Sequence, residues 1–108
     1  MSKKIHLPDL KLNDTITIKV TRQHIDSGEC GEPGRCAVAL AFLEQTTVEG
    51  VGVSTEEVEC DQSLDTYKTF DFLLHPVQSG DFQDFISDFD SKIPVSPRSF
   101  QFKLAVIL

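Results

Sequence analysis

Alternation of apolar and polar residues, the two-residue period of a strand with one buried face, predicts four β-strands in this chain. The predicted strands are residues 14–21, 48–60, 66–74 and 100–108. The second is expected to bend or bulge around Ser54 to Glu57, and it would pair with the third as a hairpin. In the third strand, Phe70, Phe72 and Leu74 share one face.

Two further segments have helical character. Apolar residues spaced three, four and seven apart predict a helix over residues 81–90 that buries one stripe. The stripe consists of Phe82, Phe85, Ile86 and Phe89. Ser79 or Asp81 is placed to cap this helix, and Pro94 prevents its continuation.

The other helix is predicted over residues 36–45, CAVALAFLEQ, because the run holds three alanines and lacks a polar face. Before it, residues 22–27, RQHIDS, form a short turn that Thr21 caps and that Gly28 ends in the left-handed conformation. A Gly- and Pro-rich loop, GECGEPGRC, joins the two segments.

The order β-α-β-β-α-β predicts an α+β domain with a four-stranded antiparallel sheet and both helices on one face, as in split β-α-β domains. Residues 1–108 are expected to form one domain, with residues 1–13 as a loosely ordered arm. In this order the last strand lies at a sheet edge beside the first and would be adhesive if exposed, so a homodimer is expected.

Composition narrows the class of protein. The chain has 108 residues, of which 40% are hydrophobic, and its longest apolar run, residues 36–43, is too short to cross a bilayer. The first ten residues carry no apolar stretch of the kind that directs export, so the cytoplasm is the expected location. Three cysteines are an odd number, which favours reduced thiols.

The acidic charge argues against nucleic-acid binding and does not exclude a basic partner protein. The net charge is −7, and residues 36–108 hold twelve Asp and Glu against four Lys and Arg. Such a surface repels a phosphate backbone. It attracts a partner of opposite charge.

Cys30, Cys36 and Cys60 together with His24 are the candidate zinc ligands. Five residues separate Cys30 from Cys36, where zinc knuckles have two to four, so no metal is expected and isolated thiols are favoured. A disulfide between Cys30 and Cys36 would require oxidising conditions.

Two other groups of residues are candidate binding sites. Asp81, Asp84 and Asp88 lie on the polar side of the Phe-lined helix, where carboxylates four apart could do acid–base chemistry or hold a cation, although a solvated helix face explains them better. Arg22, His24 and Arg35 bracket the Gly-rich loop and could bind an anion. No nucleophile, zinc-protease or phosphate-loop motif occurs, so neither an enzyme nor a cofactor is expected.

Two stretches, ITIKVTRQHIDSGECGEPGRCAVALAF at 16–42 and DFISDFDSKIPVSPRSFQFKL at 84–104, carry a resemblance. They are similar to small uncharacterised proteins of actinobacterial bacteriophages, which pair a strand and an H-I-D-x-G turn with a Cys-led, Ala-rich helix. Those proteins often have Cys-Pro where this chain has Cys36-Ala37. The resemblance covers about half of the chain and implies an intracellular accessory role in phage infection, without an activity.

Three functions remain open on these grounds, and the last of them is a structural domain of unknown role. The first is a non-enzymatic interaction protein that binds a host protein, such as a defence nuclease, and blocks it. The second is a homo-oligomer that sequesters a small anionic nucleotide near Arg22, His24 and Arg35.

Overall fold

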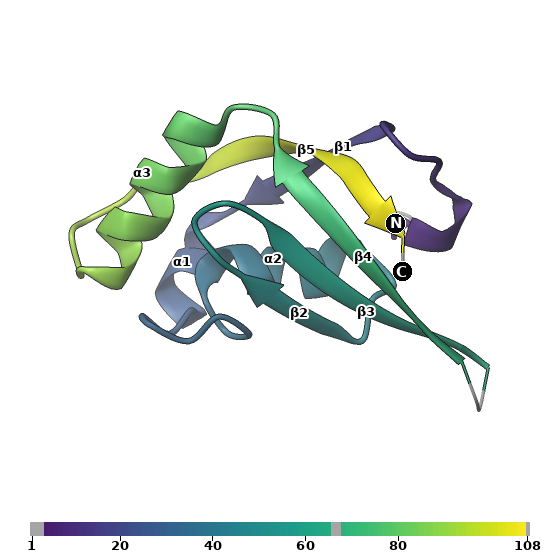
Figure 1. Cartoon of the computed structure of the whole chain (residues 1–108). Helices are drawn as coiled ribbons and strands as arrows, with labels where there is room; N and C mark the ends of the chain where they lie inside the picture. The colour runs from purple at the N-terminus through teal and green to yellow at the C-terminus, as the bar shows by residue number, and fades with distance from the viewer. Residues whose placement is uncertain (1–3, 66–67, 108) are drawn as a thin grey trace.

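The computed structural model describes residues 4–65 and 68–107, and the side chains of residues 4–61 and 72–106. It is an α+β fold with one five-stranded antiparallel sheet in the order β1-β5-β4-β3-β2. The strands are β1 (Thr15–Val20), β2 (Gly50–Val53), β3 (Val58–Asp65), β4 (Lys68–Pro76) and β5 (Arg98–Ile107). The helices are η1 (Leu7–Asp9), α1 (Arg22–Ser27), α2 (Ala37–Gln45) and α3 (Ser79–Asp90), and Figure 1 shows α2 crossing beneath the curved sheet.

The predicted strand 48–60 is wrong in one respect, because it forms two strands rather than one bent strand. The chain reverses at Ser54, whose N–H donates to the Glu57 carbonyl at 2.9 Å. The Ser54 hydroxyl accepts from the Glu57 N–H at 3.1 Å and competes with continued strand pairing. Val53 then lies opposite Val58, which adds a fifth strand to the four that were predicted.

Residues 22–27 are a helix rather than a turn, so the described chain has three α-helices where two were predicted. Thr21 is the N-cap as expected, and it forms a capping box with His24. Gly28 does not end α1 in the left-handed conformation, since its φ is −72°. A glycine is needed at position 28 because there is no space for a side chain. A Cβ there would lie 2.7 Å from the Ala37 nitrogen and 2.9 Å from the Phe89 ring.

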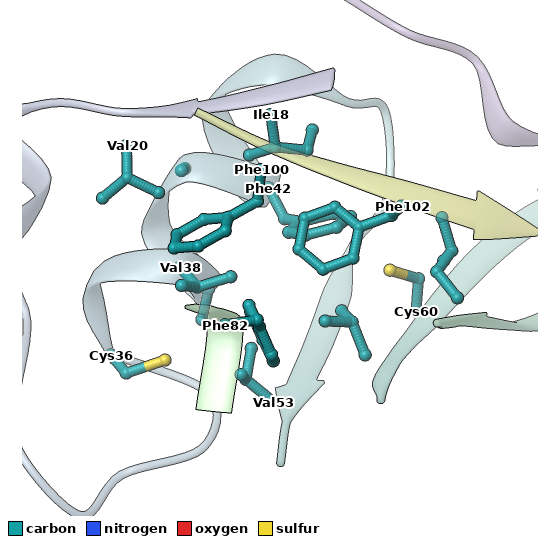
Figure 2. Packing of buried hydrophobic residues seen from close by; sticks show 14 of the residues in the cluster. Ile18, Val20, Cys36, Val38, Phe42, Val53, Cys60, Phe82, Phe100 and Phe102 are labelled. Carbon is teal, nitrogen blue, oxygen red and sulfur yellow. The ribbon is translucent and has the colours of Figure 1, made fainter. Parts of the chain in front are cut away.

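The stripe predicted on α3 is confirmed, since all four of its residues are buried. The predicted caps are wrong: the N-cap is Gln78, without a side-chain hydrogen bond, while Ser79 and Asp81 lie within the first turn. Phe82 packs edge-on against Phe100 and Phe102 of β5, and Phe42 of α2 packs edge-on against Phe102. Figure 2 shows these rings gathered in the core. Both helices therefore cover the same face of the sheet.

The last strand lies between β1 and β4, not at an edge as predicted. The first strand takes the edge instead, and β5 forms ladders on both of its sides. The alternation expected from residue 100 breaks after Leu104, where a bulge shifts the register and places Val106 opposite Leu73. Leu108 and the side chain of Phe70 lie outside the described residues. The argument for a homodimer from an exposed last strand no longer holds, and a homodimer needs other grounds.

The segment expected as an arm, residues 1–13, contacts the domain over its described part. Leu7 is fully buried, and Ile5 forms a parallel bridge with Thr46. The Asn13 N–H donates to the Leu104 carbonyl at 2.9 Å. These contacts tie residues 5–13 to α2 and to β5.

Candidate functional site

The loop between α1 and α2, residues 28–36, joins the end of α3 to the edge strand β2. The Cys30 thiol donates to the Phe89 carbonyl at 3.0 Å, and the Gly31 N–H donates to the Asp90 carboxylate at 3.0 Å. Gly31 takes a positive φ of 75°, which glycine adopts without strain. On the other side, the Pro33 carbonyl accepts from the Val53 N–H at 3.0 Å. Hydrogen bonds thereby fix the loop to the end of α3 and to β2.

Two adjoining hollows lie on either side of Pro33 and Val53. The first is a small cavity of about 50 Å³ with seven lining residues, Gly31, Glu32, Pro33, Cys36, Val53, Ile86 and Asp90. The second is a shallow groove of about 270 Å³ lined by Pro33, Gly52, Val53, Ser54, Glu57 and Glu59. Since Pro33 and Val53 line both, we treat the two as one surface and call it the Pro33 groove.

The Pro33 groove is acidic. Its charged lining residues are Glu32, Glu57, Glu59 and Asp90, and no Lys, Arg or His lines it among the described residues. Glu32 and Asp90 line the small cavity, and Glu57 and Glu59 line the shallow groove, so each hollow has two carboxylates. Such an arrangement favours a cation, and an apolar floor of Pro33, Val53 and Ile86 suits the methylene stem of a Lys or Arg side chain.

Cys36 lines the cavity as the N-cap of α2 and is only 4% exposed. Burial raises the pKa of its thiol above 9.0, and contacts with the backbone at Ala39 and Val38 offset only part of this rise. The thiol is therefore protonated at neutral pH, and it is a poor nucleophile. The groove accordingly offers carboxylates for binding and no activated group for covalent chemistry.

The three thiols should react very differently with a thiol reagent. Cys30 is exposed, whereas Cys36 and Cys60 are buried, and burial raises the pKa of Cys60 to about 12. We expect Ellman's reagent at pH 8 to modify one thiol per native chain rapidly and all three in denaturant. Peptide mapping should place the fast modification on Cys30, and fast modification of Cys60 would contradict the buried core position.

Ionisation of Cys60 should also lower the free energy of unfolding at high pH. Its pKa is 9.0 in the unfolded reference and about 12 in the folded chain, so the unfolded state loses the proton first. The contribution of Cys60 to the free energy of unfolding is therefore complete below pH 9 and declines as the pH rises toward 12.

The predicted anion-binding residues Arg22, His24 and Arg35 do not share a contact in the structure. His24 is 5% exposed and its Nε2 lies 3.1 Å from a carboxylate oxygen of Glu44. Arg35 is exposed and pairs with Glu29 at 3.5 Å, while Arg22 is exposed in the first turn of α1. Because His24 and Arg35 already face carboxylates, this region attracts an anion only weakly.

His24 has a structural role that explains its position. Its Nδ1 accepts from the Thr21 N–H at 2.9 Å, so the neutral ring carries its proton on Nε2 and donates to Glu44. The Thr21 hydroxyl in turn accepts from the His24 N–H at 3.4 Å. Histidine here takes the place that Glu or Gln holds in a capping box.

Replacing His24 therefore tests the cap. We expect His24→Ala to lower the free energy of unfolding by about 1 to 2 kcal/mol, because the Thr21 N–H loses its acceptor. His24→Gln should lower it less, since a glutamine side chain can accept the same bond. Urea denaturation measures both free energies of unfolding. Equal losses would show that burial of the imidazole ring, and not its hydrogen bond to the Thr21 N–H, accounts for the contribution of His24 to stability.

The predicted carboxylates of α3 have separate surroundings. Asp81 accepts from Arg98 at 2.6 Å, and the same guanidinium lies 5.6 Å from the centre of the Phe85 ring. Asp84 is exposed and Asp88 is half-buried. In the described part of the chain, no three His, Cys, Asp or Glu side chains form a group that could hold a metal ion. This holds for the carboxylates of α3 and for the candidate zinc ligands His24, Cys30, Cys36 and Cys60.

The acidic residues of the Pro33 groove were not singled out from sequence. Glu32, Glu57 and Asp90 lie far apart along the chain and resemble ordinary surface charges. The one local signal is the Gly- and Pro-rich composition of residues 28–36, which indicates an irregular loop without showing which elements it meets.

Comparison of the chain with models of protein families, with curated proteins and with solved structures finds no match. Among the described residues, every helix is too short or too polar to cross a membrane.

Proposed function

We propose that this chain is a small acidic interaction protein, without enzymatic activity, that binds a basic segment of a partner protein in the Pro33 groove. The observation that carries the proposal is a concave surface whose charged lining residues, among those described, are all carboxylates, beside a loop that is hydrogen-bonded to α3 and to β2. A site on a fixed scaffold loses little conformational entropy on binding.

Charge complementarity supplies the specificity. A Lys or Arg side chain entering the shallow groove would meet the carboxylates of Glu57 and Glu59 and the apolar surface of Pro33. The net charge of −7 would also attract a basic partner from a distance and speed association. The resemblance to actinobacteriophage proteins implies an accessory role in infection, and on that ground the partner proposed is a host protein that binding would block.

Absence of catalysis is part of the same proposal. Within the groove the titratable side chains are rim carboxylates and the Cys36 thiol, whose raised pKa leaves it protonated. Neither hollow is lined by a histidine or lysine that could act as a general base at neutral pH.

Calorimetry with an arginine-rich nonapeptide as the probe tests the proposal. The variant Glu32→Gln/Glu57→Gln should bind the peptide roughly 2- to 30-fold more weakly, since each exposed ion pair contributes about 0.2 to 1 kcal/mol. The matched control is Asp9→Asn/Asp26→Asn, which removes the same charge from exposed positions outside the groove.

The control should retain nearly the wild-type affinity. If both double variants lose affinity equally, the peptide responds only to overall charge and the groove is not the site. If the wild-type chain does not bind the peptide at low salt, the proposed partner chemistry is wrong.

A further inference from the structure

No described helix packs on the outer face of the sheet, because α2 and α3 both pack on the inner face. Its edges, by contrast, are partly closed. The Gln45 side chain bonds both the N–H and the C=O of Lys19 in β1, at 2.8 and 2.7 Å, and Pro33 bonds Val53 in β2. A partner strand would have to displace these bonds to pair at either edge. On the outer face, no such bond closes the positions whose side chains the structure describes.

Charge on the outer face is divided between its two halves. Lys19 of β1 and Lys103 of β5 are exposed on one half. Glu59 and Asp61 of β3 are exposed on the other.

Between the two halves lies a partly exposed apolar pair, Leu73 and Val106, which are register partners. Glu59 stands directly opposite Leu73 on β3, and His75 stands opposite Lys103. The face thus runs from basic through apolar to acidic across β5, β4 and β3.

We propose that this face binds the same face of a second copy of the chain, across a twofold axis that passes near Leu73. A twofold interface must be complementary to itself, and a face with one basic and one acidic half satisfies this requirement. The rotation places β5 of one copy over β3 of the other, so Lys103 meets Glu59 twice. A face of uniform charge would repel its own copy.

The division of charge on this face favours a second copy over other occupants. A highly acidic partner would be repelled by Glu59 and Asp61, and a highly basic one by Lys19 and Lys103. Only a surface with the same division of charge matches both halves, and this chain supplies one. The resulting contact is small and polar, so it should be reversible and sensitive to salt.

Charge reversal tests the pairing by sedimentation velocity across a dilution series. Lys103→Glu and Glu59→Lys should each weaken self-association by about fivefold or more, because each places two like-charged pairs in the interface. The combined variant Lys103→Glu/Glu59→Lys should recover it, since opposite charges face each other again. Lys92→Glu, in the turn after α3, makes the same charge change elsewhere and serves as the control.

Three results would overturn the proposal. The first is a wild-type chain that stays monomeric at high micromolar concentration and low salt. The second is a dimer that neither reversal weakens, which would place the interface elsewhere, and the third is a combined variant that stays as weak as the single ones. Glu59 also lines the Pro33 groove, whereas Lys103 does not, so Lys103→Glu is the variant that separates a failure of self-association from a failure of peptide binding.

Discussion

Phe102→Ala is expected to lower the free energy of unfolding by about 3 to 5 kcal/mol. Phe102 is fully buried, and its ring contacts Phe42 of α2 at 5.0 Å and Phe82 of α3 at 5.3 Å between centroids. Removing it would leave a cavity where both helices meet the sheet (Figure 2). The total free energy of unfolding of a small domain is only about 5 to 15 kcal/mol, so this one substitution should remove much of it.

Urea denaturation followed by circular dichroism measures the loss. Gln101→Ala is the matched control, because the neighbouring side chain is exposed on the outer face and should change stability by less than about 0.5 kcal/mol. If Phe102→Ala does not fold, Phe102→Leu retains part of the volume and should show a smaller loss. A loss below about 1 kcal/mol for Phe102→Ala would mean that α2 and α3 do not meet at this residue.

Gly28→Ala should also destabilise the fold, by about 1 to 3 kcal/mol. The backbone at Gly28 is extended, with φ −72° and ψ 152°, so alanine meets no conformational penalty there. The cost comes from packing, because the new Cβ would lie 2.7 Å from the Ala37 nitrogen and 3.0 Å from the His24 carbonyl oxygen. Neither backbone atom can move without shifting α1 against α2.

Gly80→Ala provides the matched comparison for this prediction. A Cβ at Gly80 has no atom within 4 Å, and the residue lies inside α3, so stability should be unchanged or rise by up to about 1 kcal/mol. Thermal melts of the two variants should move in opposite directions. Equal tolerance of alanine at both positions would contradict the close approach of the loop to α2 and Phe89.

Local patterns predicted most of the elements but not their arrangement. The stripe of α3 and the alternation of β1 are properties of short segments, and both were read correctly. The position of β5 in the centre depends on long-range pairing with β1 and β4, which periodicity does not encode. The turn at Ser54 was missed because one hydroxyl, accepting two backbone N–H groups, reverses a run that otherwise reads as a bent strand.

The candidate site was harder to predict than the fold for the same reason. Arg22, His24 and Arg35 lie within one short stretch of the sequence. In the structure, however, His24 contacts Glu44 and Arg35 pairs with Glu29. The acidic groove instead collects residues from the loop, the β2-β3 hairpin and the end of α3, which only tertiary structure brings together. Sequence indicated an acidic interaction protein, but it could not indicate which surface is hollow.

The central claim is that a basic segment binds in the Pro33 groove, and chemical-shift mapping with the arginine-rich nonapeptide tests it most directly. Titration of ¹⁵N-labelled protein should move the amide signals of residues 31–32, 34–36 and 52–57 and of Asp90, and Glu32→Gln/Glu57→Gln should reduce these shifts. Signals from α1 and from β1 should stay in place. Shifts spread evenly over the acidic surface, or concentrated around Lys19 and Lys103, would contradict the claim.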